Sequence, residues 1–235
     1  TLDHPYFSLR SVTVSTDTDV ARTAATALVG QAGLYRGTSI WRIDRRGAES
    51  ALLRPGWVKR VRVVRRFPDS VRIALQSHQR LALTLLGTVP HIVTDDGIIY
   101  PAPTTAALPD LPWVTGWERT ASRGARLDLI RRAVSLAARA GRAGISFSQV
   151  DCLDDGTLRA YLDSSELEVV FGRHFDPSDS LARLAMVFEH MSPAQLEAAR
   201  YIDLSFDGRA VVRAGGRGVE PTVSARPARR RPGRG

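Results

Sequence analysis

The sequence has few of the residues that hold a small protein together through covalent bonds or metal ions. It contains one cysteine, Cys152, among 235 residues, so a disulfide within the chain is excluded. None of its five histidines stands at metal-ligand spacing with another histidine, with Cys152 or with a carboxylate cluster. The glycine-rich phosphate-binding patterns G-x-G-x-x-G and G-x-x-x-x-G-K-[ST] are absent. We therefore expect no metal, no cofactor and no catalytic site.

A long apolar run is also missing. A transmembrane helix needs about 20 mostly apolar residues, and the best candidate, Leu81 to Val89, is short and interrupted by polar residues and glycine. Residues 1–5 have neither the basic nor the apolar region of a signal peptide. Because the chain starts at Thr1 and not at methionine, we expect that an upstream segment, with any targeting signal, precedes it.

Basic charge is unevenly distributed. Residues 215–235 contain six arginines and one acid, so this tail accounts for +5 of the net charge of +9. The tail is rich in glycine, proline and arginine and has almost no apolar residues, which predicts disorder. A basic tail can bind nucleic acid or anionic lipid. The simpler interpretation is a solvated tail.

Alternating apolar and polar residues are most regular between Pro55 and Ala82. Two alternating runs flank the turn sequence Phe67–Ser70, where proline presets φ and aspartate can bond its own backbone. This pattern predicts a β-hairpin with one buried face. Its apolar positions are Val61, Val63, Val71, Ile73 and Leu75.

The residues before this hairpin complete a β-α-β-α-β-β order over residues 1–80. Residues 7–14 predict a strand, and a helix capped by Thr16 or Asp17 follows and ends near Gly33. Residues 39–43 predict a short strand or turn. A second helix over residues 45–53 ends before Pro55. The apolar face of the first helix comprises Val20, Ala24, Ala27 and Leu28.

Residues 81–214 predict a second, larger domain of mixed β structure with two amphipathic helices. The expected strands and hairpins lie near residues 81–85, 93–99, 146–153, 157–162, 166–171, 200–206 and 209–213. The apolar face of the first helix comprises Leu127, Ile130, Val134 and Ala137, and that of the second Leu181, Leu184, Ala185 and Phe188. The fold class is therefore α+β, with a boundary near residue 80 and a disordered tail over residues 215–235.

Several groups that could carry chemistry have simpler structural explanations. The aspartate pairs before Gly97 and Gly156 are typical of hairpin turns. His174 and Asp176 could form a dyad, but Asp176 is better placed as a helix cap. Cys152 is interpreted as a small apolar packing residue, and the four tryptophans as core residues instead of a ligand cage.

Together, the motifs resemble the extracytoplasmic region of the FtsQ/DivIB family of bacterial cell-division proteins, with residues 1–80 similar to a polypeptide-transport-associated (POTRA) domain. Pro55–Val58, Arg65–Pro68 and Val71–Ile73 resemble the family signature "pWV…a.V.R.wP.tl.I.v", and Tyr201–Phe206 resembles "yvDLRf". The resemblance covers residues 7–213. It departs from the family pattern at residues 76–82 and at Ser205. Further similar segments are Phe7–Val14, Asp96–Gly97, Leu108–Leu111, Phe171–Arg173 and Leu181–Leu184.

The resemblance implies a single-pass inner-membrane protein at the division septum, with this region on the periplasmic side and a transmembrane helix upstream of Thr1. It implies a non-catalytic scaffold that binds the small proteins FtsB and FtsL. An added partner strand would pair with the last strand of the chain. The residues expected at this site are Arg173, Tyr201, Phe206, Asp207, Gly208, Arg209, Ala210, Val211, Val212 and Arg213.

Three alternatives remain open at this stage. The last strand could be an ordinary edge guarded by Arg209 and Arg213. The chain could be another POTRA-bearing transport or assembly component, although neither repeated POTRA units nor a β-barrel pattern is visible. It could also be a basic nucleic-acid-binding protein, although most of the excess charge lies in the tail.

Overall fold

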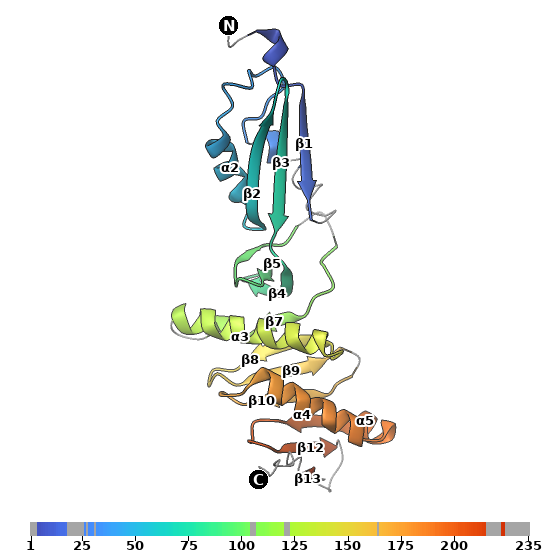
Figure 1. Ribbon diagram of the computed structural model, residues 1–235. Helices are drawn as coiled ribbons and strands as arrows, with labels where there is room; N and C mark the ends of the chain where they lie inside the picture. The colour runs from blue at the N-terminus through green and yellow to red at the C-terminus, as the bar shows by residue number, and fades with distance from the viewer. Residues whose placement is uncertain are drawn as a thin grey trace, which may run out of the picture. The chain divides into compact units, whose positions relative to one another are not determined.

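The computed structural model describes residues 4–17, 26, 28–30, 32–103, 107–119, 123–163, 165–214 and 222–223. The chain forms two compact units, one of Thr1–Arg80 with Ile98–Tyr100 and one of Leu81–Gly97 with Pro101–Gly235. Both combine strands and helices, so the predicted α+β class is confirmed (Figure 1). In the part of the chain that is described, no helix is both long and apolar enough to cross a membrane.

The first unit is built on a three-stranded sheet in which β3 lies between β1 and β2 (Figure 1). β3 is antiparallel to β2, with Val63 opposite Ile73, and parallel to β1, with Val12 opposite Val71. The predicted hairpin is therefore confirmed. The elements are η1 (Pro5–Phe7), β1 (Ser11–Thr16), α2 (Arg45–Leu53), β2 (Val58–Arg66) and β3 (Ser70–Ser77), and β6 (Ile99–Pro101) begins in the segment 98–100.

The core of this unit lies between the sheet and α2. The apolar positions of the hairpin point toward the helix, while Arg60, Arg62 and Arg72 are exposed. Complete burial of one large aliphatic side chain contributes about 1.5–3 kcal/mol. The main contributors are Leu9, Ile40, Ile43, Leu52, Val63, Val71 and Ile73.

The predicted start of the first strand needs correction. β1 begins at Ser11, not at residue 7, because Pro5–Phe7 form a 3-10 turn that His4 caps through Nδ1. Thr16 is the last residue of β1, and the Asp17 carboxylate accepts bonds from the backbone N–H and hydroxyl of Ser77. The start of the helix that these two residues are predicted to cap lies outside the described residues.

Of the two alternatives predicted for residues 39–43, a short strand or a turn, the structure has turns with a single bridge between Ser8 and Ser39. In the predicted first helix, residues 26 and 28–30 are helical and Leu28 packs against the core. The predicted helix positions Val20, Ala24 and Ala27 lie outside the described residues.

In the second unit the strands lie in the order β13-β12-β11-β10-β9-β8-β7-β4-β5. The pairs β8–β9, β9–β10 and β11–β12 are antiparallel, and β10–β11 is parallel. The strands are β4 (Arg80–Leu86), β5 (Val89–Thr94), β7 (Trp113–Thr115), β8 (Phe147–Cys152), β9 (Leu158–Leu162), β10 (Glu168–Phe171), β11 (Ala199–Asp203), β12 (Ala210–Ala214) and β13 (Thr222–Val223). The helices are η2 (Trp117–Arg119), α3 (Arg123–Arg142), α4 (Pro177–His190) and α5 (Pro193–Ala198).

The long helices α3 and α4 pack against each other and against the sheet, α3 on β8 and α4 on β12 (Figure 1). Their predicted apolar faces are buried at Ile130, Val134, Leu181 and Leu184, but Leu127 near the start of α3 is 36% exposed. Helix α4 therefore supports β12, and α3 supports α4 and β8.

The tryptophans divide between core and surface. Trp117 is buried, and its indole N–H donates to the hydroxyl of Thr84. Trp57 and Trp113 are half-buried. Trp41 is 41% exposed, so its assignment to the core is wrong. The Trp41 backbone carbonyl lies in a turn held by Arg65, and this turn leaves the indole at the surface.

Candidate partner-binding edge

The last long strand, β12, has one face packed against the core and one face in solvent. It pairs with β11 so that Val211 lies opposite Asp203 and Arg213 opposite Tyr201. Ala210 and Val212 are buried beneath α4, while Val211 is half-buried and Arg213 is exposed. This alternation of period two is what holds the strand in register.

The turn between β11 and β12 presents an exposed aromatic ring. Residues 205–209 are all exposed, and the Phe206 side chain is 54% exposed. Gly208 has φ of +67°, a left-handed conformation that suits glycine. Phe206 is one of several large apolar side chains that the described residues expose, and its place in the turn that begins β12 makes it the candidate contact at this edge.

Arg183 of α4 holds this turn from behind. Its Nη1 donates to the carbonyl oxygens of Phe206 at 2.7 Å and of Arg209 at 2.9 Å. Its Nε lies 3.1 Å from the Asp179 carboxylate, one turn earlier on α4. The Arg183 side chain is only 9% exposed. A buried guanidinium needs such partners, because burial of a charged group is otherwise costly.

Arg173 lies beside this turn because two parallel strands end together. Val170 of β10 is opposite Asp203 of β11, and the N–H of Leu204 donates to Val170. Beyond the strands, Gly172 lies so close to Ser205 that an added Cβ would be 3.2 Å from its Cα. Arg173 follows Gly172 and Phe206 follows Ser205, so Arg173 and Phe206 leave the sheet at the same end.

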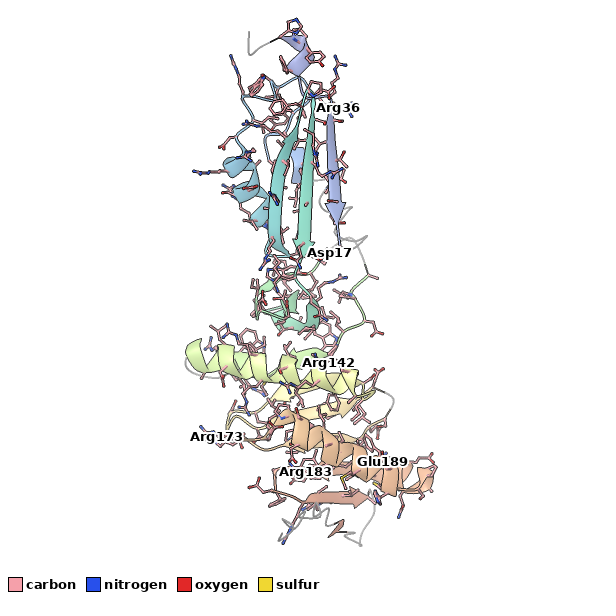
Figure 2. The ribbon with its side chains drawn as sticks, in the orientation of Figure 1. Asp17, Arg36, Arg142, Arg173, Arg183 and Glu189 are labelled. Atoms are coloured by element: carbon pink, nitrogen blue, oxygen red, sulfur yellow. The ribbon has the colours of Figure 1, made fainter. Side chains whose placement is uncertain are left out.

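A cavity of about 610 Å³ opens next to Arg173 and the start of α4. It is lined by charges of both signs, together with His174, Phe175, Leu204 and Ser205. Arg132 of α3 supports this wall by donating to the Arg173 carbonyl and lying over the Phe175 ring. Figure 2 shows Arg173 and Arg183 in this part of the second unit. The charged lining residues are Asp128, Arg132, Arg173, Asp176, Asp179, Arg183 and Asp207.

Tyr201 marks the other end of the β11–β12 pair. The Arg213 guanidinium lies 5.6 Å from the centre of its ring, and its hydroxyl donates to the Asp203 carboxylate at 3.3 Å. Burial, followed by the negative charge of Asp203, raises the pKa of the Tyr201 hydroxyl. Tyr201 therefore stays neutral around neutral pH and acts here through its ring and one donated bond.

Outside β12 lies the short strand β13. It pairs antiparallel with β12, Val223 opposite Ala210 and Thr222 opposite Val211. Thr222 and Val223 are the described part of the tail 215–235; the rest of the predicted disordered tail lies outside the described residues. An incoming strand at this edge would take the place of β13.

Of the ten residues expected at the site, Arg173 and residues 206–210 lie at the turn end of the β11–β12 pair, Tyr201 and Arg213 lie toward its other end, and Val211 and Val212 lie between them. Their role in binding stays a prediction. Sequence reasoning missed Arg183, although Asp179 four residues earlier and the buried stripe of α4 were available signals. It also missed β13, because a two-residue strand in a polar segment has no periodicity.

Asp176 and Cys152, which the sequence predicts to be structural residues, both have structural roles. The Asp176 carboxylate accepts bonds from the N–H groups of Ser178 and Asp179, so it caps α4. Cys152 is fully buried, and burial, reinforced by Asp151, raises the pKa of its thiol to about 12.

Comparison with known proteins identifies both the first unit and the whole chain. A family model described as "POTRA domain, FtsQ-type" matches residues 7–78, so the first unit is a POTRA domain of this type. The cell division protein FtsQ of Myxococcus fulvus is 30% identical over 205 residues, which cover 84% of this chain and 70% of that protein. The cell division protein FtsQ of a Geobacter species is 22% identical over 212 residues, or 82% and 72% of the two chains.

The chain belongs to the FtsQ family of bacterial cell-division proteins. The resemblance expected from the hairpin and the Tyr201–Phe206 motif is therefore confirmed, and a role in cell division follows.

Proposed function

We propose that this protein is a non-catalytic scaffold of the division machinery that binds FtsB- and FtsL-type partners by β-strand addition. The observation that carries the proposal is the β11–β12 pair, in which β12 follows an exposed turn that displays the Phe206 ring. Among the described residues, the outer side of β12 is paired at Ala210 and Val211 alone, with the two residues of β13. A partner strand there would gain affinity from backbone bonds and selectivity from alternate side chains.

The proposed contact residues fall into three groups. Phe206 supplies the apolar anchor, and Arg173, Arg209 and Arg213 favour an acidic partner segment. The backbone of residues 210–213 supplies the ladder. Asp207 and Gly208 shape the turn, and Tyr201 positions Arg213 through its ring.

Family membership supports placing the protein at the division septum. We further propose that a helix upstream of Thr1 anchors it in the inner membrane, with this region on the periplasmic side. The match to FtsQ proteins over most of the chain favours this role over that of another POTRA-bearing transport component or of a nucleic-acid-binding protein.

The test is a titration of the chain with an FtsB-like segment, followed by fluorescence anisotropy. Phe206→Ala is expected to weaken binding at least tenfold, as for a central aromatic contact. The matched control is Phe67→Ala, because Phe67 is also 54% exposed but lies in the first unit. Equal binding by both variants and the wild type would place the partner site elsewhere.

A pair of proline variants tests strand addition itself. The N–H groups of successive strand residues point to opposite edges, so one of Val211 and Val212 donates outward. Proline at that position should abolish partner binding with little change in circular dichroism, while proline at the other should disturb the β11–β12 ladder.

Deletion of residues 215–235 removes β13 and should tighten binding. Retained affinity in both folded proline variants would contradict strand addition.

A further inference from the structure

Four aromatic rings form a continuous row on the surface of the first unit. The ring centres of Tyr6 and Phe7 are 5.2 Å apart, those of Phe7 and Trp41 5.9 Å, and those of Trp41 and Phe67 4.6 Å. Three of the four side chains are exposed, Tyr6 by 56%, Trp41 by 41% and Phe67 by 54%. We call Tyr6, Phe7, Trp41 and Phe67 the aromatic row.

The backbone holds this row in place, so its exposure belongs to the fold. The Ile40 N–H donates to the Phe7 carbonyl at 2.8 Å, which joins the first segment to the Trp41 turn. The Arg65 guanidinium donates to the carbonyl oxygens of Trp41 and Ile43. The row thus combines three segments far apart in sequence, and apolar rings gathered in this way on a soluble unit mark an interaction site.

The segments that build the row are rich in positive charge. The three segments that build it, residues 4–10, 35–46 and 65–70, carry seven arginines and two acids. One of the acids, Asp69, lies 3.8 Å from Arg10. Six of the arginines are exposed, and Figure 2 labels one of them, Arg36, near the start of β1. The arginines are Arg10, Arg36, Arg42, Arg45, Arg46, Arg65 and Arg66.

We infer that the aromatic row and its arginines form a contact surface for an anionic lipid bilayer. Tryptophan and tyrosine rings are enriched at the membrane–water interface, where an amphipathic ring has both an apolar and a hydrated side. Arginines around such rings attract anionic headgroups, and this attraction falls with ionic strength. The row enters the interface region and the arginines contact phosphate groups.

This surface is distinct from the β12 edge, since all of its residues belong to the first unit. It would orient the POTRA domain on the membrane independently of partner binding. Membrane binding by this surface would require its rings and charges alone and no partner at β12.

The test measures quenching of Trp41 by phosphatidylglycerol vesicles with brominated acyl chains. The wild-type chain should lose part of its tryptophan fluorescence on vesicle addition, and Trp41→Phe should remove this quenching while leaving vesicle binding nearly intact. Because quenching reports a specific ring, binding through the six arginines of the tail cannot produce it. A chain ending at Ala214 should show the same quenching.

Matched variants separate this surface from the partner site. Phe67→Ala should weaken binding of the Ala214-ending chain to phosphatidylglycerol vesicles at least fivefold, and Arg36→Glu with Arg66→Glu should abolish it. Phe206→Ala, with an equally exposed ring, should leave it unchanged. Any one of three results would overturn the inference. The first is wild-type fluorescence that brominated lipid leaves unchanged, and the second is quenching that persists in Trp41→Phe. The third is equal vesicle binding by Phe67→Ala and Phe206→Ala. Vesicles of phosphatidylcholine alone should bind weakly.

Discussion

Arg183 and Phe206 are joined by a hydrogen bond of 2.7 Å from the guanidinium Nη1 to the backbone carbonyl. The bond links the buried side of α4 to the exposed turn between β11 and β12. Since the same nitrogen also reaches the Arg209 carbonyl, one side chain fixes both ends of the turn that displays the Phe206 ring.

Replacement of Arg183 by methionine should therefore loosen the turn and destabilise the second unit. Loss of hydrogen bonds from a charged donor to two carbonyl oxygens costs about 2–4 kcal/mol. Urea unfolding measures the loss, and binding of the FtsB-like segment should weaken at the same time. The control Arg200→Ala removes an exposed arginine whose nearest carboxylate is 3.8 Å away, and it should change stability by less than about 0.5 kcal/mol. Equal stability of the two variants would contradict a structural role for Arg183.

Glu49 should stabilise the POTRA domain by satisfying a backbone group at the sheet edge. β2 is an outer strand of the three-stranded sheet, and the Val63 N–H donates to the Glu49 carboxylate at 2.8 Å. Glu49→Ala leaves this half-buried donor without its partner and should lower the free energy of unfolding by about 1–2 kcal/mol. Thermal unfolding of wild type, Glu49→Ala and the exposed control Ser50→Ala checks it. A melting temperature unchanged in Glu49→Ala would refute the assignment.

Thr84 should be essential to a buried polar network in the second unit. Its hydroxyl accepts from the Trp117 indole N–H and donates to the Val114 carbonyl, both at 2.8 Å. Thr84→Val keeps the shape but removes both bonds, so two buried groups lose a partner at a cost of about 2–4 kcal/mol. Tryptophan fluorescence during urea unfolding gives the change, and the exposed substitution Thr88→Val serves as the control. A loss below about 0.5 kcal/mol would show that water replaces the hydroxyl.

Cys152 should be unreactive in the folded protein and should make stability fall at high pH. Burial raises the pKa of its thiol from 9.0 to about 12, so the folded state keeps the proton at pH values where the unfolded chain loses it. Its contribution to stability is therefore complete below pH 9 and declines as the pH rises toward 12. Comparison of Cys152→Ala with wild type between pH 8 and pH 11 isolates this slope.

A thiol reagent gives a second measurement at constant pH. The native chain at pH 8 should react at least a hundredfold more slowly than the chain in urea, because only the thiolate reacts and the folded environment disfavours it. Rapid labelling of the native protein would contradict the burial of Cys152.

Local pattern was sufficient for most of the elements and for the family. The period of two in β2 and β3, the proline after α2, and the Asp176 cap of α4 act over a few residues, so they can be recognised without tertiary information. The same applies to the order of the motifs that resembles FtsQ proteins.

Tertiary structure decided the features that depend on pairing between distant segments. Whether residues 39–43 become a strand depends on a partner, and only Ser8 supplies one bridge. Trp41 has a large apolar side chain of the kind often found in a core, but the turn held by Arg65 leaves it at the surface. The nearness of Arg173 to Phe206, the anchoring by Arg183 and the pairing of β13 with β12 likewise arise from long-range register. Short-range periodicity sets which residues face inward, whereas the closure of long loops sets which faces meet.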